Sequence, residues 1–241
     1  MKAALLSGIV CLALAAPAAA LATSKEETRL RKVAADYAKC VVHKSRAKAS
    51  EAVLSTADNK AVMRKFTQII DSDCMLKSVE ADAEAVQMRF PGTTLQGAIA
   101  DALVNADFAT RGDESFADRL PLAQPAMLEP EQEASELAQA KDERERQVLQ
   151  AAFVEYKARA WMAAYGECVV RQNPEGARYW LLTPPDAPDE MSRIKALQPA
   201  LSACLRAGSI KFTRTILRGT VAINYYRLAL ATRVPAAGGN N

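Results

Sequence analysis

The chain has 241 residues, a formal net charge of +3, and a composition in which 50% of residues are hydrophobic and only 6% are aromatic. This length accommodates one large domain or two small ones, and the apolar content is sufficient for a substantial core. The low aromatic content and the abundant alanine favour close packing of helices and argue against a fold based on sheets.

The first 22 residues have the pattern of a secretory signal peptide. Lys2 supplies a positive start, residues 3–16 are apolar, and Ala20-Leu21-Ala22 forms a small-x-small cleavage site. The apolar stretch is too short for a membrane span with flanking anchors, so no transmembrane segment is expected after cleavage. Cys11 lies within the apolar stretch and should leave with the peptide. A lipoprotein anchored through Cys11 is not favoured, because the preceding residue, Val10, does not fit an acylation motif. We therefore predict residues 1–22 as a signal peptide and the protein as exported, either periplasmic or secreted.

A pattern of matched positions occurs twice in the remaining chain. Tyr37-Ala38-Lys39-Cys40 corresponds to Tyr165-Gly166-Glu167-Cys168, and two valines follow each of these cysteines. A second cysteine comes later in each copy, at Cys74 or Cys204. Each copy then closes with an aromatic residue, a leucine, a glycine and an alanine in the same order, which are Phe90, Leu95, Gly97 and Ala100, and Phe212, Leu217, Gly219 and Ala222. A fixed order of matched positions at a long period indicates a duplicated structural unit.

Signal cleavage leaves four cysteines, an even number that favours disulfides in an exported chain over metal or redox chemistry. Four cysteines permit three pairings, and the duplication selects Cys40–Cys74 and Cys168–Cys204, since copies of one unit should carry copies of one bond. Each bond would close a loop of about 35 residues and stabilise the fold by roughly 3–4 kcal/mol. A catalytic dithiol is the alternative, but the chain has no Cys-x-x-Cys to tune a thiolate.

The first copy, residues 23–106, begins with a helix whose apolar positions follow three- and four-residue spacing. A short second helix and a third helix should follow, the third with Val62, Phe66, Ile69 and Ile70 on one side and Cys74 near its end. Residues 86–90 alternate as in a short strand, and a last helix runs from about Thr93. We therefore predict a mainly α fold of two tandem pseudo-symmetric helical repeats, each with about four helices, room for one short strand and an internal disulfide.

Between the copies, residues 107–130 carry prolines and an Arg111-Gly112-Asp113 turn, which predicts a linker or long loop. Residues 131–146 are rich in helix formers and should extend the helix that enters the second copy, within a unit spanning 131–233. There Asn173-Pro174-Glu175 is a strong helix start. Pro199 should kink or split the helix that carries Cys204. The tail, residues 234–241, is predicted to be disordered.

The second copy resembles a repeat in uncharacterised exported proteins of Gram-negative bacteria. The resemblance lies in Tyr165-Gly166-Glu167-Cys168, in Leu182-Thr183-Pro184-Pro185, in Cys204 and Phe212, and in Leu217-Arg218-Gly219, and it extends more loosely to residues 37–105. It implies a periplasmic or secreted address and carries no activity. The first copy departs most, with Leu95-Gln96-Gly97 in place of the arginine-containing string.

No catalytic motif is present. The single histidine, His43, has no second histidine to complete a zinc site, and its counterpart in the second copy is Arg171. For His43, a favourable position for a cation near a helix end is a simpler explanation than a catalytic or metal-binding role. The acids at Asp71 and Asp73 and between residues 80 and 84 lack the spacing of a calcium loop. We assign no catalytic residue, no metal and no cofactor, and whether the protein is an enzyme stays open, with a non-enzymatic role favoured.

The distribution of charge is uneven. Residues 191–241 contain no acid and eight bases, whereas residues 107–146 contain eleven acids and five bases. Either the acidic segment packs near the basic one, or the bases form a face for an anionic partner such as an envelope component or an acidic protein. Nucleic acid is not expected, because the chain is exported and has no recognition motif. The candidate partner-binding residues are Arg206, Lys211, Arg214 and Arg218.

The function that these features favour is that of a binding or envelope-associated module. The alternative is a hydrolase acting on envelope polymers, with carboxylates that converge in a cleft between the two copies. The two hypotheses differ in what lies at the junction of the copies. A purely structural or oligomer-forming role is a third option.

Overall fold

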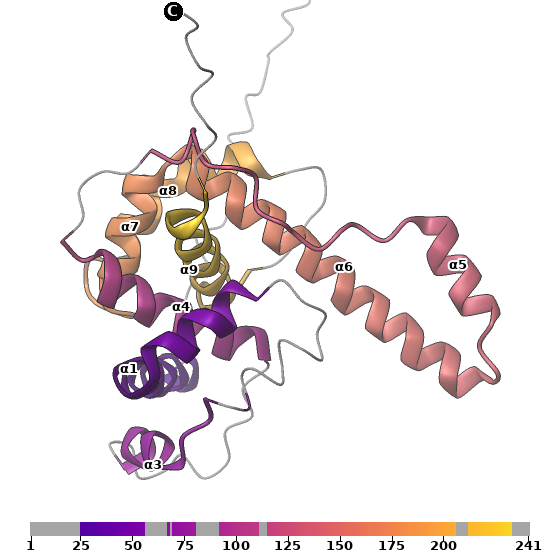
Figure 1. Ribbon diagram of the computed structural model, residues 1–241, viewed down its shortest axis with the longest axis horizontal. Helices are drawn as coiled ribbons and strands as arrows, with labels where there is room; N and C mark the ends of the chain where they lie inside the picture. The colour runs from indigo at the N-terminus through magenta and orange to yellow at the C-terminus, as the bar shows by residue number, and fades with distance from the viewer. Residues whose placement is uncertain are drawn as a thin grey trace, which may run out of the picture.

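The structure is a computed structural model that describes residues 25–55, 67, 69–80, 92–110, 115–205 and 212–232. Within these ranges the fold is mainly helical (Figure 1). The helices are α1 (Lys25–Leu54), α3 (Ser72–Glu80), α4 (Gly92–Phe108), α5 (Pro130–Ala138), α6 (Glu143–Gln172), α7 (Pro174–Leu182), α8 (Glu190–Cys204) and α9 (Arg214–Leu230). None of the helices in the described ranges is both long enough and apolar enough to cross a bilayer.

Both predicted disulfides are present. Cys40 of α1 is bonded to Cys74 of α3, and Cys168 of α6 is bonded to Cys204 of α8, with Cα–Cα distances of 5.5 and 5.8 Å. Each bond therefore fastens a shorter helix to one of the two 30-residue helices. The sequence separations are 34 and 36 residues, which corresponds to about 3–4 kcal/mol of stabilisation for each bond.

The long helices α1 and α6 lose helical geometry at matching positions. Five residues after Cys40, Ser45 has φ −144° and ψ 45°, and five residues after Cys168, Asn173 has φ −149° and ψ 75°. At Asn173 the chain starts α7, because the asparagine side chain accepts a hydrogen bond from the Gly176 N–H and a proline follows. After Ser45 the helix resumes as part of α1, so the predicted second helix of the first copy is a kinked continuation of the first.

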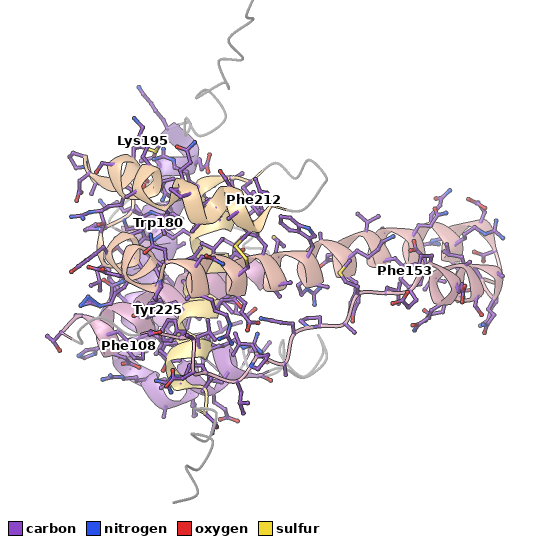
Figure 2. All side chains as sticks on the ribbon, turned by 90° about the horizontal axis from the view of Figure 1, so that it is seen from above. Phe108, Phe153, Trp180, Lys195, Phe212 and Tyr225 are labelled. Carbon is purple, nitrogen blue, oxygen red and sulfur yellow. A yellow bond between two sulfur atoms is a disulfide. The ribbon has the colours of Figure 1, made fainter. Side chains whose placement is uncertain are left out.

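Helices α4 and α9 form the centre of the core. They pack against each other, α4 also packs on α1, and α9 also packs on α6. Because α4 is covered on both sides, its residues are apolar over most of the circumference, as expected for a buried helix. Beyond the crossing, Phe108 and Phe116 meet the ring of Tyr225 edge-on at 5.9 and 5.3 Å, and Figure 2 shows Phe108 and Tyr225 close together in the body.

A glycine from each helix forms the crossing point. A Cβ placed on Gly97 would lie 2.5 Å from the Gly219 Cα, and one placed on Gly219 would lie 3.0 Å from the Gly97 Cα. Side-chain carbons do not approach main-chain atoms as closely as 2.5 Å, so position 97 requires glycine, while a Cβ at position 219 would fit only if the facing backbone moved slightly. The recurrence of glycine in the two copies predicted close backbone packing, and the two glycines prove to be packed on each other.

The described part of the segment between the halves, residues 115–129, is held against α6 and the end of α9. Arg171 of α6 donates hydrogen bonds to the carbonyl oxygens of Phe116, Arg119 and Leu120, at 2.6–3.2 Å. The Leu120 N–H donates to the carbonyl of Thr232, just after α9. Buried Phe116 anchors the same segment in the core. The arginine expected near a helix end therefore binds carbonyl groups of the segment between the halves.

Of residues 131–146, which we expected to extend the helix entering the second copy, only residues 143–146 belong to α6. Helix α5 ends at Ala138, and α6 begins at Glu143 after the cap residue Asp142, whose side chain accepts a hydrogen bond from the Glu145 N–H at 2.7 Å. This cap stops the helix from running through. Helix α5 instead lies along the first half of α6, held by an ion pair of 2.7 Å between Glu133 and Lys157. The two form an arm that projects from the body (Figures 1 and 2).

Two further expectations are corrected. Cys74 lies near the start of its helix and not near the end, because the Asp71 side chain accepts a hydrogen bond from the Cys74 N–H and caps α3. Ile69 and Ile70 precede that helix.

Helix α8 runs through Pro199 without being split. Pro199 and Lys195, whose carbonyl loses its helical partner, both lie on the exposed face, where water can satisfy that carbonyl.

Several predictions lie outside the described residues. These are the signal peptide over 1–22, the strand over 86–90, the helical positions Val62 and Phe66, and the disordered tail over 234–241. The stretch of the second copy that corresponds to residues 86–90 is residues 209–213. Of these, Phe212 and Thr213 are described, and neither lies in a strand. Thr213 instead caps α9 by accepting a hydrogen bond from the Ile216 N–H.

Adding a methyl group at the crossing tests its geometry. In an open helix Gly→Ala stabilises by about 1 kcal/mol. We expect Gly97→Ala to destabilise instead, by about 1–3 kcal/mol, because its Cβ would overlap main-chain atoms of α9. Gly219→Ala should have a smaller effect of the same sign, and urea denaturation measures both. Stabilisation by either variant would contradict the close approach.

The two disulfides should have different local effects. Among the described side chains of α3 only Cys74 and Ser78 are buried, whereas α8 also buries Ile194, Leu197 and Ala200. Removing the first bond by Cys40→Ser/Cys74→Ser should therefore raise the hydrogen exchange of α3 selectively. Removing the second bond by Cys168→Ser/Cys204→Ser should leave α8 docked and lower global stability. Unchanged protection of α3 in the first variant would contradict this.

Candidate functional site: an ion cluster between the two halves of the chain

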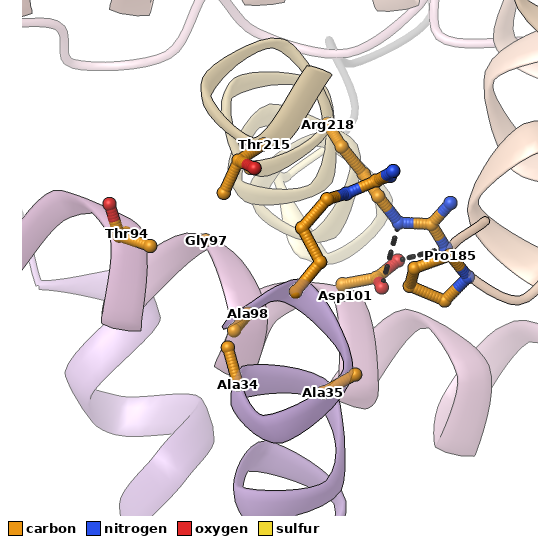
Figure 3. A pocket seen from close by; sticks show the side chains of 11 residues that line it. Ala34, Ala35, Thr94, Gly97, Ala98, Asp101, Pro185, Thr215 and Arg218 are labelled. Carbon is orange, nitrogen blue, oxygen red and sulfur yellow. Dashed lines mark hydrogen bonds and ion pairs between the residues drawn. The ribbon is translucent and has the colours of Figure 1, made fainter. Parts of the chain in front are cut away.

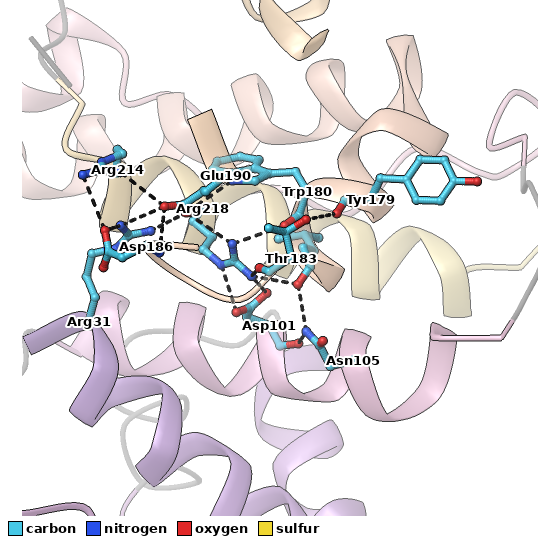
Figure 4. A network of polar contacts seen from close by, with 11 residues as sticks. Arg31, Asp101, Asn105, Tyr179, Trp180, Thr183, Asp186, Glu190, Arg214 and Arg218 are labelled. Carbon is cyan, nitrogen blue, oxygen red and sulfur yellow. Dashed lines mark hydrogen bonds and ion pairs between the residues drawn. The ribbon is translucent and has the colours of Figure 1, made fainter. Parts of the chain in front are cut away.

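Carboxylates converge at the junction between α1, α4, α7, α8 and α9, as Figure 4 shows. At the centre is Glu190, the first residue of α8, whose side chain is completely buried. The turn before α8 brings in Asp186, which has a positive φ of 61° and donates its N–H to Glu190 Oε2 at 3.0 Å. The Trp180 indole N–H donates to the other oxygen, Oε1, at 3.4 Å.

Three arginines surround Glu190. Arg31 of α1 and Arg218 of α9 lie 2.5 and 3.4 Å from Oε1, and Arg214 of α9 lies 3.3 Å from Oε2. Asp186 shares two of these partners, at 2.5 Å from Arg31 and 3.5 Å from Arg214. The cluster therefore connects the first of the described helices, α1, to the last, α9.

Arg218 makes the largest set of contacts. Its Nε and Nη2 donate to the two oxygens of Asp101 of α4 at 3.0 and 3.1 Å, a bidentate pair. The same guanidinium donates to the carbonyl oxygens of Trp180, Leu181 and Thr183 at 2.7–3.2 Å. These carbonyls end α7, where a cation is favoured. Arg218 thus caps one helix while it pairs with a carboxylate on another.

The charges of the cluster balance, with three guanidinium groups facing Asp101, Asp186 and Glu190. Burial by itself raises the pKa of Glu190, but the Arg31 ion pair, the Asp186 N–H and Arg218 together outweigh it and lower that pKa below the ordinary value. Burial raises the pKa of Asp101, and the Arg218 guanidinium opposes the rise. Each of the three carboxylates therefore has at least one guanidinium partner within this chain.

Two small pockets flank the cluster. One, of about 40 Å³, is lined by Asp101, Arg218 and the two crossing glycines (Figure 3). The other, of about 50 Å³, lies beside Asn105. Such volumes hold a few water molecules, whereas small-molecule sites measure about 300–1,000 Å³. Among the described residues, the junction between the halves therefore collects polar side chains, and the two pockets beside them are too small for a substrate.

The four candidate partner-binding residues are placed as follows. Arg214 and Arg218 are buried in the cluster, with 9% and 5% of their surface exposed, and their guanidinium groups face carboxylates of this chain. Arg206 and Lys211 lie outside the described residues. The disulfide cysteines take part in the two bonds described above, and His43 is exposed on α1.

One of the two explanations for the uneven charge was that acids of the same chain neutralise the basic residues 191–241. We expected those acids to come from residues 107–146. The described acids that neutralise Arg214 and Arg218 are Asp101, Asp186 and Glu190, which lie outside that range. Within the acidic range, Asp107 pairs with Arg46 and Glu133 with Lys157. The acids of this range that pair with bases of α1 and α6 are therefore not the acids that neutralise Arg214 and Arg218. On α9, Asp107 accepts a hydrogen bond from the Tyr226 hydroxyl at 2.9 Å.

Sequence reasoning missed four members of the cluster, Arg31, Asp101, Asp186 and Glu190. Asp101 carried a signal, since it is the only charged residue between Leu95 and Val104. A lone charge in an apolar helix is seldom buried without a partner. The other three lie among charged or turn residues, where the sequence pattern does not separate buried from exposed side chains.

No group of three or more potential metal ligands occurs in the described part of the chain. No protein-family model, curated protein or solved structure matches this chain. The function is therefore inferred from the geometry of the junction and from the charges on the surface.

Neutralising the central carboxylate should destabilise the fold. We expect Glu190→Gln to lower the free energy of unfolding by about 3–5 kcal/mol near neutral pH, because three buried arginines lose a shared counter-charge. Glu175→Gln, which removes an exposed acid on α7, is the matched control and should change stability by less than about 0.5 kcal/mol.

The same variant should flatten the acid limb of the stability profile. Because the pKa of Glu190 is lowered in the folded state, its ionised form stabilises the fold above the ordinary carboxylate range, and this contribution is lost as the pH falls through the lowered pKa. Below about pH 5 the wild type should therefore lose stability more steeply than Glu190→Gln. Denaturant titrations across this range measure the slope, and parallel profiles would contradict the assignment.

Proposed function

We propose that the protein is an exported binding module for an anionic component of the cell envelope, in which the buried ion cluster has a structural role. One observation carries this proposal: the acids that meet between the halves are matched by arginines of the same chain, and the pockets beside them admit only water. Binding is then left to the outer surface.

The charge of α1 supports an anionic partner. This helix contains eight bases and four acids, and on its inner side Arg31 is neutralised by Asp186 and Glu190. Lys44 and Arg46 pair with acids of the same chain, whereas the side chains of Lys25, Lys32 and Lys39 are exposed to solvent. Removal of Lys2 with the signal peptide would leave a chain of 30 basic and 28 acidic residues. Attraction to an anionic surface therefore depends on where the charges lie and not on their sum.

Export is supported by the N-terminal pattern together with the two disulfides, which persist in oxidising compartments. The resemblance to exported proteins of Gram-negative bacteria favours the periplasm or the medium. A periplasmic address would place the protein beside the anionic lipids and polymers of the envelope.

We also infer that the two halves are copies of one unit. This is supported by the order of their parts: a long helix with a cysteine, a break five residues later, a disulfide-linked second helix, and a 17-residue helix with glycine at its sixth position. The ion cluster does not follow the duplication, since Arg218 corresponds to Gln96. The cluster thus belongs to the joint between the halves and not to the repeated unit.

A hydrolase remains the second candidate, and one observation favours it: three carboxylates meet at the junction, and burial raises the pKa of Asp101 as in a general acid. Structural ion pairs perturb pKa values as well. Both Asp101 oxygens are engaged by Arg218, and the adjacent space of about 40 Å³ is too small for a sugar ring or a peptide.

Binding to a soluble polyanion separates the two candidates. We expect fluorescence anisotropy to detect binding of labelled dextran sulfate that weakens as salt rises, with no binding of neutral dextran. Purified cell-wall polymer should be left intact. Binding that is absent or independent of salt would contradict the module, and cleavage that is lost in Asp101→Asn would establish the hydrolase instead.

A further inference from the structure

The outer face of α1 carries a straight row of basic residues. Lys25, Lys32 and Lys39 are spaced by seven residues, and His43 follows after one further turn. At 100° per residue these four side chains fall within a sector of about 40°. The sector is opposite the buried side of the helix, on which Val33, Ala34, Tyr37, Ala38 and Val41 lie. We call Lys25, Lys32, Lys39 and His43 the α1 stripe.

The stripe is exposed and has little internal compensation. All four of its side chains are exposed, and 62% of the Lys39 side chain is open to solvent. The nearest acid of α1, Asp36, lies at the edge of this sector, and its ion pair with Lys39 is long, at 3.9 Å. Such exposed pairs contribute little and are screened by salt. The positive charge of the stripe is therefore available to a partner outside the chain.

The shape of the stripe fits a flat surface. The helix is uninterrupted from Lys25 to the break at Ser45, and the stripe extends about 27 Å along it. Tyr37, the only Phe, Tyr or Trp of α1, is buried, so the stripe offers a base no ring larger than the His43 imidazole and no series of rings on which successive bases could stack. The pocket that reaches Lys39 has a volume of about 50 Å³, too small for a phosphorylated side chain.

We infer that the α1 stripe is a docking surface for an anionic phospholipid bilayer, which it binds reversibly through the phosphate headgroups. This rests on the proposed function and names the anionic component. Each base at such a surface strengthens binding roughly fivefold at physiological salt, and three lysines together contribute roughly a hundredfold. Attraction of this size without a buried apolar anchor gives peripheral binding that salt reverses.

The test is co-sedimentation with vesicles of phosphatidylcholine, with and without about one third phosphatidylglycerol. The mature, oxidised protein should bind the anionic vesicles at about 0.05 M salt, leave them at about 0.5 M, and ignore phosphatidylcholine alone. Neutralising the stripe with Lys25→Gln/Lys32→Gln/Lys39→Gln should weaken binding roughly a hundredfold. Glutamine has a helix propensity close to that of lysine, and circular dichroism shows whether α1 remains folded.

A matched control separates the stripe from overall charge. Lys141→Gln/Arg144→Gln/Lys195→Gln removes three exposed bases from the arm and α8, the same change in net charge. This variant should bind within about threefold of the wild type, because its bases are away from the contact surface. The inference is overturned if the wild type does not bind anionic vesicles, if the stripe variant binds as well as the wild type, or if the control weakens equally.

Two further arms identify the source of the phosphate. Sodium phosphate at the ionic strength of a sodium chloride control should displace no more protein than the chloride does; stronger displacement would indicate a single-phosphate site and overturn the bilayer assignment. Dextran sulfate binding is measured on the same three proteins. If the wild type and the stripe variant bind dextran sulfate alike while vesicle binding is absent, the anion-binding module survives and the stripe does not.

Discussion

The fold depends on one buried carboxylate and its arginines. An ionised group in a protein interior costs several kcal/mol unless it is paired, and Glu190 is completely buried. Its partners come from α1 and α9, at opposite ends of the described chain, so the charge is stable only when both helices are in place. Apolar contacts have no preferred direction, whereas the ion pairs of Glu190 require α1, α8 and α9 to stand where the structure has them.

The ion cluster in turn depends on the glycine crossing. Because Gly97 and Gly219 bring two backbones into contact, residues next to them on α4 and α9 lie within reach of each other. Asp101 is one turn beyond Gly97, and Arg218 directly precedes Gly219. A larger residue at the crossing would move the arginine away from Asp101 and from the carbonyl groups that end α7. Packing and electrostatics are therefore coupled through two residues that have no side chain.

The sequence was sufficient where one residue type decides the local structure. Paired cysteines in matched copies predicted both disulfides, Asn173 with Pro174 predicted the start of α7, and recurring glycine predicted close packing. It was insufficient where a charge has a distant partner. Arg218 looks the same in sequence whether it faces solvent or Asp101, which is 117 residues away. Asp71 likewise caps a helix that apolar spacing alone assigned to the residues before it.

The internal pairing also changes which charges an outside partner meets. On α1, Arg31 faces the cluster while the α1 stripe faces solvent, so folding sorts the bases of one helix into a structural set and an accessible set. The acids of residues 129–146, seven against three bases, lie on and around the arm, which projects on the side away from α1 (Figure 1). An anionic surface would attract α1 and repel the arm. Electrostatics alone would then orient the molecule with its arm pointing away from that surface.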